Sequence, residues 1–111
     1  MTTIPKGAKK LRTVPICGVK VPVYSVTPGM VPDMGDDFGQ ADMNRMCIFV
    51  RAGQHPTQEK DTIVHECAHI FLTLSGLRSM LEAHHGRREG FEEFEESLVR
   101  VATPHLVSLF K

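Results

Sequence analysis

Two short runs of β-branched residues near the N-terminus show a partly alternating pattern of apolar and polar positions. Gly18 separates the two runs. Alternation of this kind is typical of strands with one buried face. The pattern therefore predicts a hairpin or two short strands, over residues 12–17 and 20–26. Pro15 and Pro22 indicate that at least one of these strands lies at the edge of a sheet, where a missing backbone donor is tolerated.

The clearest strand signal is the short apolar run Arg45–Val50. Such a run, ended by a turn, is typical of a buried strand. Residues 27–45 precede it, are interrupted by Gly and Pro, and show little periodicity. They predict a long loop, in which residues 38–41 could touch the sheet.

A long helix is predicted after this strand, with Thr57 as its N-cap and Ser75-Gly76 as its C-terminal stop. One stripe at helical spacing is apolar and predicts the core face. A second stripe is polar, and polar groups on a buried helix need partners, which a metal ion could supply. The apolar stripe contains Val64, Cys67, Ala68, Phe71 and Leu74, and the polar stripe contains Thr62, His65, Glu66 and His69.

The last third of the chain predicts further helix. Residues 77–90 predict one helical turn followed by a loop. From Phe91 onward apolar residues repeat at helical spacing, and Pro104 is expected to break or kink this helix, with Thr103 as a cap for a short final piece. The order of elements predicts an α+β fold, in which a short antiparallel or mixed sheet packs on the long helix and on the C-terminal helix.

The composition bounds the class of protein. A chain of 111 residues with 41% hydrophobic and 23% charged residues predicts one globular domain. We expect this domain over residues 12–111, after a flexible arm at residues 1–11. The net charge of zero gives no indication of a nucleic-acid partner, and no apolar run reaches the length of a membrane span. The odd number of cysteines without C-x-x-C spacing favours reduced thiols and a cytoplasmic location.

The candidate chemistry lies in the sequence HECAH at residues 65–69, which fits the pattern H-E-x-x-H. On a helix, residues four apart lie one turn apart on the same face, so His65 and His69 can direct two imidazoles at one point. Two neutral imidazoles supply half of a tetrahedral zinc site. Glu66 can reach the open side of that site and accept a proton from a water that attacks a carbonyl carbon.

A catalytic zinc site usually has a third protein ligand. The acidic cluster from Glu92 to Glu96 supplies candidates. The positions one to three turns beyond Glu95 are apolar, so Glu95 is expected on the inward face of its helix. Polar residues follow Glu93 and Glu96, which are expected on the solvated side. Glu95 is therefore the expected third ligand, with Glu92 in reserve.

The motif HECAH after a strand and a turn, followed by E-x-x-L-V-x-V-A from Glu95, resembles the minimal gluzincin-like metallopeptidases akin to the ImmA/IrrE family. The resemblance covers roughly residues 14–110. It implies a small zincin-like domain and a zinc metalloendopeptidase that binds one Zn²⁺ per chain. It also implies that His65, His69 and Glu95 bind the zinc and that Glu66 is the general base.

Two other interpretations remain open. SprT-like proteases take a histidine in an H-G context as the third zinc ligand, and His84-His85-Gly86 lies at a similar distance after the motif. Under this interpretation His85 is the ligand. The other alternative is a non-catalytic zincin-like protein, in which zinc is structural and the chain acts as an interaction or regulatory module.

A peptide or protein is the expected substrate. If the strand Met46–Val50 lies at the sheet edge beside the cleft, it can bind an extended peptide by strand addition. No residue is identified as the group that stabilises the oxyanion, and His84, His85 and Tyr24 are candidates of low rank. The sequence gives no indication of the oligomeric state.

Overall fold

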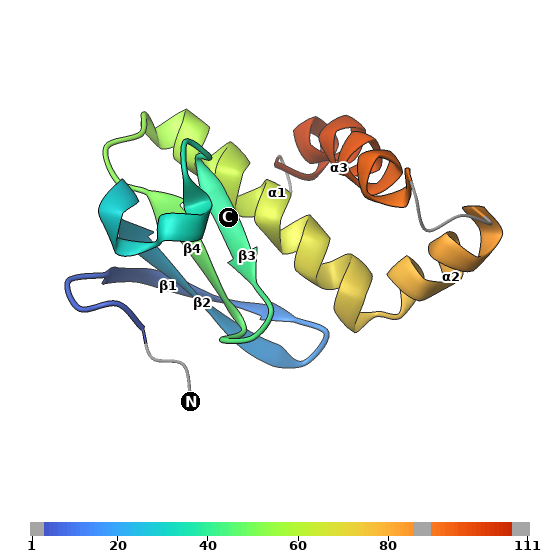
Figure 1. Ribbon diagram of the computed structural model, residues 1–111, viewed down its shortest axis with the longest axis horizontal. Helices are drawn as coiled ribbons and strands as arrows, with labels where there is room; N and C mark the ends of the chain where they lie inside the picture. Colours follow the sequence, from blue (N-terminus) through green and yellow to red (C-terminus); the bar gives the residue numbers. More distant parts are fainter. Residues whose placement is uncertain (1–3, 86–89, 108–111) are drawn as a thin grey trace.

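The computed structural model describes residues 4–85 and 90–107. The first residues of the expected arm, part of the loop expected before the acidic helix, and the end of the expected domain lie outside the described residues. The described chain has an α+β fold in which a four-stranded mixed sheet packs against helices (Figure 1). This level of the fold agrees with the sequence-based prediction.

The predicted hairpin is confirmed. Strands β1 (Lys9–Ile16) and β2 (Val19–Val26) pair in antiparallel fashion. Cys17 and Gly18 connect them with φ angles of 50° and 80°, and a two-residue turn with both φ values positive matches the twist of a hairpin. Because β1 begins at Lys9, the end of the expected flexible arm is instead part of the sheet. Backbone pairing with β2 holds Lys9 and Lys10 although their side chains are polar and exposed.

The strand order of the sheet is β1-β2-β4-β3. Strand β4 (Cys47–Arg51) runs parallel to β2 and antiparallel to β3 (Gly39–Asp42). The expectation that the Met46–Val50 strand could lie at the edge is therefore wrong, since β4 is an interior strand. The edge beside the helices is β3, which lies within the segment predicted as a loop.

Strand β4 is interior because both of its faces are buried. Ile48 and Val50 pack in one apolar cluster with residues of α1, whereas Cys47 and Phe49 pack in a second cluster on the opposite face. Two short 3₁₀ turns (Pro28–Met30 and Pro32–Met34) and the chain around them cover this second face. The uninterrupted apolar run in the sequence is the signature of this double burial.

Helix α1 (Pro56–Leu74) carries the H-E-x-x-H motif. Its N-cap is His55, whose Nδ1 accepts a hydrogen bond from the backbone N–H of Thr57 at 3.2 Å. The prediction of Thr57 as the cap is wrong, because Pro56 takes the first helical position. Proline has no backbone N–H, and an N–H at this position would have no acceptor within the helix. The predicted stop is confirmed, since Ser75 is the C-cap and Gly76 has a φ of 82°.

The faces of α1 differ from the predicted stripe. Ile63 and Ile70 join the apolar cluster on the sheet. The predicted stripe is confirmed in part, since Cys67 and Leu74 pack against this cluster and Val64 is buried, but Phe71 keeps 45% of its surface exposed. Val64, Ala68 and Phe71 line an apolar groove between β1 and α3. The polar stripe faces the other side, toward β3.

The C-terminal half consists of α2 (Leu77–His85) and α3 (Phe91–Val107). Helix α3 lies across α1 on the side away from the sheet (Figure 1). Pro104 does not end the helix, and the Thr103 hydroxyl donates to the carbonyl oxygen of Val99 at 2.7 Å instead of capping a new helix. Over residues 4–85 and 90–107, no helix combines the length and apolar character needed to cross a bilayer.

Candidate metal centre

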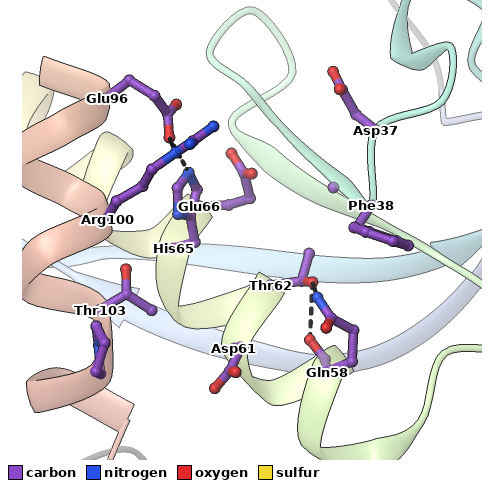
Figure 2. Close-up of a pocket in the computed structure, with 12 residues that line it drawn as sticks. Asp37, Phe38, Gln58, Asp61, Thr62, His65, Glu66, Glu96, Arg100 and Thr103 are labelled. Carbon is purple, nitrogen blue, oxygen red and sulfur yellow. Dashed lines mark hydrogen bonds and ion pairs between the residues drawn. The ribbon is translucent and has the colours of Figure 1, made fainter. Parts of the chain in front are cut away.

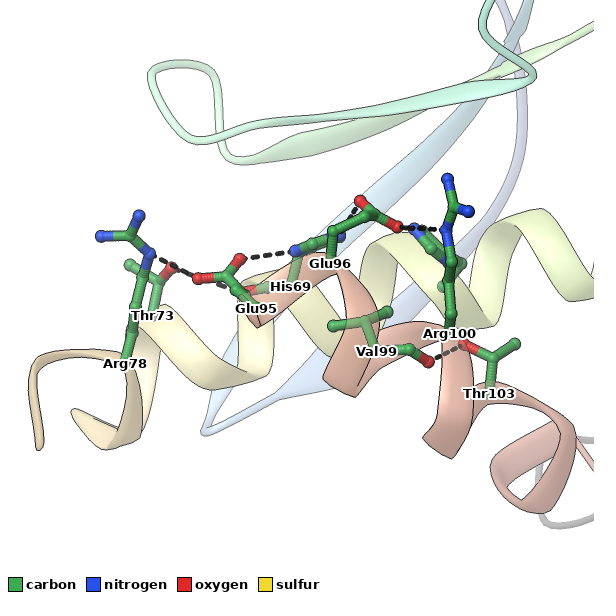
Figure 3. Close-up of polar contacts among 9 residues, drawn as sticks. His69, Thr73, Arg78, Glu95, Glu96, Val99, Arg100 and Thr103 are labelled. Atoms are coloured by element: carbon green, nitrogen blue, oxygen red, sulfur yellow. Dashed lines mark hydrogen bonds and ion pairs between the residues drawn. The ribbon is translucent and has the colours of Figure 1, made fainter. Parts of the chain in front are cut away.

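The two histidines of the motif meet one carboxylate from α3. His65 and His69 lie one turn apart on α1, with ring centroids 5.0 Å apart. Nε2 of His65 lies 2.9 Å from Oε2 of Glu96 (Figure 2). Nε2 of His69 lies 3.2 Å from Oε1 of the same carboxylate (Figure 3). The structure therefore brings together three side chains that could hold a metal ion.

The donor set and its spacing fit a zinc ion. Ligand atoms from all three residues lie within 4.8 Å of one another. Zinc bonds of about 2.0–2.1 Å at tetrahedral angles place ligand atoms about 3.3 Å apart. The Nε2 atoms of His65 and His69 lie 2.9 and 3.2 Å from the two different oxygens of Glu96. Two imidazole nitrogens and one carboxylate oxygen are also ligands that zinc prefers.

The protonation states of His65 and Glu96 suit metal binding. Burial lowers the pKa of His65, which favours the neutral imidazole that a metal requires. Burial acts to raise the pKa of Glu96, but the neighbouring His65 and His69 and the hydrogen bond from Arg100 together hold that pKa below its usual value. At neutral pH the site thus presents a carboxylate beside a neutral ring.

Glu95, the predicted third ligand, lies on the other side of the His69 ring. Its Oε2 is 2.6 Å from Nδ1 of His69, and its Oε1 accepts a hydrogen bond from Nε of Arg78 at 2.6 Å (Figure 3). The predicted inward position is confirmed, since Glu95 is only 9% exposed. A carboxylate that accepts from Nδ1–H fixes the tautomer in which Nε2 is free to bind a metal.

The other ligand candidates lie apart from this cluster. Glu92 and His84 are exposed. The ring of His85 packs beside Phe91 and Phe94, with centroid distances of 5.9 and 5.5 Å. Tyr24, a candidate for oxyanion stabilisation, packs with the cluster on the sheet face opposite α1. Among the described residues, the group that could hold a metal ion is therefore His65, His69 and Glu96.

Glu66 lies between α1 and the edge strand. Its carboxylate accepts a hydrogen bond from the backbone N–H of Ala41 in β3. Burial raises the pKa of Glu66 to about 7, and the nearby Glu96 acts in the same direction, whereas His69 and the Ala41 N–H oppose the rise. A carboxyl group with a pKa near neutrality can both accept and donate a proton.

Gly39 permits the close approach of β3 to α1. A Cβ atom at Gly39 would collide with Cγ2 of Thr62 and would lie 3.3 Å from Cγ of Glu66. Thr62 has little freedom to move aside, because it is buried and its hydroxyl bonds both the side chain of Gln54 and the carbonyl oxygen of Gln58. The absence of a side chain at Gly39 therefore sets the distance between the edge strand and Glu66.

A groove runs between β3 and the two helices on both sides of this cluster. One half is a pocket of about 400 Å³ beside His65, and the other is a pocket of about 530 Å³ beside His69. Figure 2 shows the first half, with Glu66 and Glu96 directed into it from different helices. Both halves share the residues Asp37, Gly39, Glu66 and Glu96.

In the metal-free protein we expect Glu66→Gln to stabilise the fold at pH 8. Burial holds the folded-state pKa of Glu66 at about 7, against about 4.3 for an unfolded chain. The stability that Glu66 contributes is therefore fully present below about pH 4.3 and is lost as the pH rises to 7. Glutamine keeps an acceptor for the Ala41 N–H and carries no charge, so we expect a gain of about 3–4 kcal/mol at pH 8.

Urea unfolding of both proteins, with a chelator present, measures this difference at pH 8 and at pH 4. The two proteins should have nearly equal free energies of unfolding at pH 4, where Glu66 is protonated in both states. A gain of the same size at both pH values would contradict the assignment of a buried, charge-sensitive carboxyl group.

Comparison of the chain with protein-family models, with curated proteins and with solved structures finds no match. The geometry of the cluster is thus the basis for any functional conclusion.

Proposed function

We propose that the chain is a zinc-dependent metallopeptidase, with zinc held by His65, His69 and Glu96 and with Glu66 as the general base. The observation that carries the proposal is the convergence of three donor side chains from two helices beside the half-buried carboxyl group of Glu66. The H-E-x-x-H spacing and the resemblance to gluzincin-like peptidases akin to the ImmA/IrrE family support it. Glu96 takes the place of Glu95 as proposed ligand because its carboxylate faces Nε2 of both histidines.

Zinc bound at this site would polarise a substrate carbonyl and lower the pKa of a water. Glu66 lies on the same helix as the two histidine ligands, and its carboxyl group points into the groove (Figure 2). Glu66 would accept the proton of the attacking water and transfer it to the leaving amine.

Glu95 and Arg78 would orient the His69 ring without contacting the metal. Glu95 contacts Nδ1 of His69 and is itself held by Arg78, so the ring has one preferred orientation and one preferred tautomer. A carboxylate that accepts a hydrogen bond from a metal-ligating histidine fixes the orientation and the tautomer of the imidazole ring. Glu95 is therefore a positioning residue in this proposal.

A peptide is the proposed substrate because β3 is an edge strand beside the groove. The outer backbone groups of an edge strand can pair with an extended chain. The groove passes the metal ligands on both sides, so a chain lying along β3 would present an internal bond to Glu66.

The experiment that tests the proposal begins with protein from which metal has been removed by chelation. We expect this protein to take up one zinc per chain, and the zinc-loaded form to cleave members of a diverse peptide library, with products identified by mass spectrometry. Renewed chelation should stop cleavage. A chain that binds no zinc contradicts the whole proposal, whereas a chain that binds zinc and leaves the library intact contradicts the peptidase assignment and favours a non-catalytic zinc site.

A further inference from the structure

Peptide hydrolysis places negative charge on the carbonyl oxygen in the transition state, and a cation or hydrogen-bond donor beside that oxygen lowers the barrier. Two cationic side chains line the groove among the described residues, Arg78 and Arg100. They lie in different halves of the groove, so their surroundings decide which one is available to a substrate.

Arg78 is held by the carboxylate of Glu95. Its Nε donates to the buried carboxylate of Glu95 at 2.6 Å, and its guanidinium lies 5.1 Å from the centre of the Phe91 ring. The charge of Arg78 is therefore largely balanced by Glu95, and its side chain is less exposed than that of Arg100, at 34% against 75%.

Arg100 is placed differently. It follows Glu96 by one helical turn on α3, and its Nε donates to Oε2 of Glu96 at 3.2 Å. That oxygen also faces Nε2 of His65, so the guanidinium lies directly beside the metal-ligand group. The side chain is 75% exposed, and it lines the same pocket as Glu66.

Figures 2 and 3 show where the guanidinium of Arg100 points. In Figure 2 the Arg100 side chain extends from α3 into the pocket, on the side of His65 where Glu66 lies. In Figure 3 its terminal nitrogens point away from α3, beyond the Nε that contacts Glu96. The contact with Glu96 thus fixes the base of the guanidinium fork and directs the far end into the groove.

We infer that Arg100 is the catalytic cation of the groove, which donates hydrogen bonds to the carbonyl oxygen of the scissile peptide as that oxygen becomes negative. This inference rests on the proposed metallopeptidase function. It assigns the oxyanion-stabilising role to a residue on the helix that supplies Glu96, opposite the general base on α1. An arginine is suited to this role because its planar donors can serve Glu96 and a second oxygen at the same time.

The experiment uses the cobalt-substituted protein at pH 7.5, with inorganic phosphate as a tetrahedral anionic probe. The visible cobalt spectrum reports metal binding first and phosphate binding second. We expect Arg100→Ala to weaken phosphate binding by about 10- to 100-fold, a range typical of the loss of one charge-assisted donor pair. The affinity for cobalt in the absence of phosphate should change by less than about threefold. Arg100→Lys should keep part of the phosphate affinity, and Lys20→Ala, which removes an exposed charge on the hairpin, should keep all of it.

The possible failures are distinct. If the unmodified chain binds no cobalt, the metal site itself is absent and both proposals fail. If cobalt binds and Arg100→Ala binds phosphate as tightly as the unmodified chain, the Arg100 inference alone is wrong. If Arg100→Ala lowers the affinity for cobalt as much as that for phosphate, Arg100 only orients Glu96 and the catalytic role is also wrong.

Discussion

Replacement of Glu66 by glutamine is expected to lower kcat for peptide cleavage by roughly 10³-fold, within the range for loss of a general base. Glutamine has nearly the same shape as glutamate and keeps an acceptor for the backbone N–H of Ala41. It has no basic oxygen to accept the proton of the attacking water. Zinc content should stay at one per chain, because Glu66 is not among the three converging donors.

Glu59→Gln is a matched control for this prediction. Glu59 lies in the first turn of α1, on the same helix but outside the groove. We expect the control to cleave at the rate of the unmodified chain. Full activity in Glu66→Gln would exclude Glu66 as the base, and loss of zinc in that variant would show that Glu66 is a ligand.

Replacement of Glu96 by alanine is expected to weaken zinc binding by more than about 100-fold, whereas Glu95→Gln should weaken it by about 10- to 100-fold. The second range is that of carboxylates that orient a ligating histidine without touching the metal. Glu96 should have the larger effect because its carboxylate lies 2.9 Å from Nε2 of His65 and 3.2 Å from Nε2 of His69.

Zinc affinity is measured by competition with a coloured chelator, with circular dichroism as the check on folding. Glu92→Ala is the control, since Glu92 is exposed on the same helix and should bind zinc normally. If Glu95→Gln loses more zinc affinity than Glu96→Ala, Glu95 is the third ligand, as the apolar pattern of the sequence predicts. The assignment of Glu96 from the geometry is then wrong.

The choice between two adjacent glutamates illustrates what a sequence can predict here. Spacing within one helix brings His65 and His69 together, because residues four apart always share a face. Position within the apolar pattern likewise identifies Glu95 as buried, as found. Which oxygen meets Nε2 of His69 depends on the rotation of α3 against α1, and that rotation is set by tertiary packing.

Glu95 and Glu96 are both drawn toward His69, one to each ring nitrogen. Burial of Glu95 is explained by Arg78, which is 17 residues away in sequence and gave no local signal. The spacing of Glu96 and Arg100, four residues apart on a helix, was the one local indication that Glu96 has a defined partner.

The edge strand was missed for a related reason. Residues 39–42 carry neither β-branched nor aromatic side chains, so no alternation predicts a strand. The strand exists because β4 offers a row of backbone partners, from Cys47 to Val50. By contrast, the interior strand and the long helix have strong local patterns and were predicted well.

The three donors of the candidate metal centre come from α1 and α3, and the sheet supplies none of them. Helix α3 leaves Phe94, Leu98 and Val101 between 37% and 69% exposed, so its apolar contact with the rest of the chain is incomplete. A ligand that binds only the native state adds about 4 kcal/mol of stability at 1,000 times its Kd. Bound zinc would therefore act as a clamp between the two helices, and the lifetime of the chain in the presence of cellular proteases would follow the supply of free zinc.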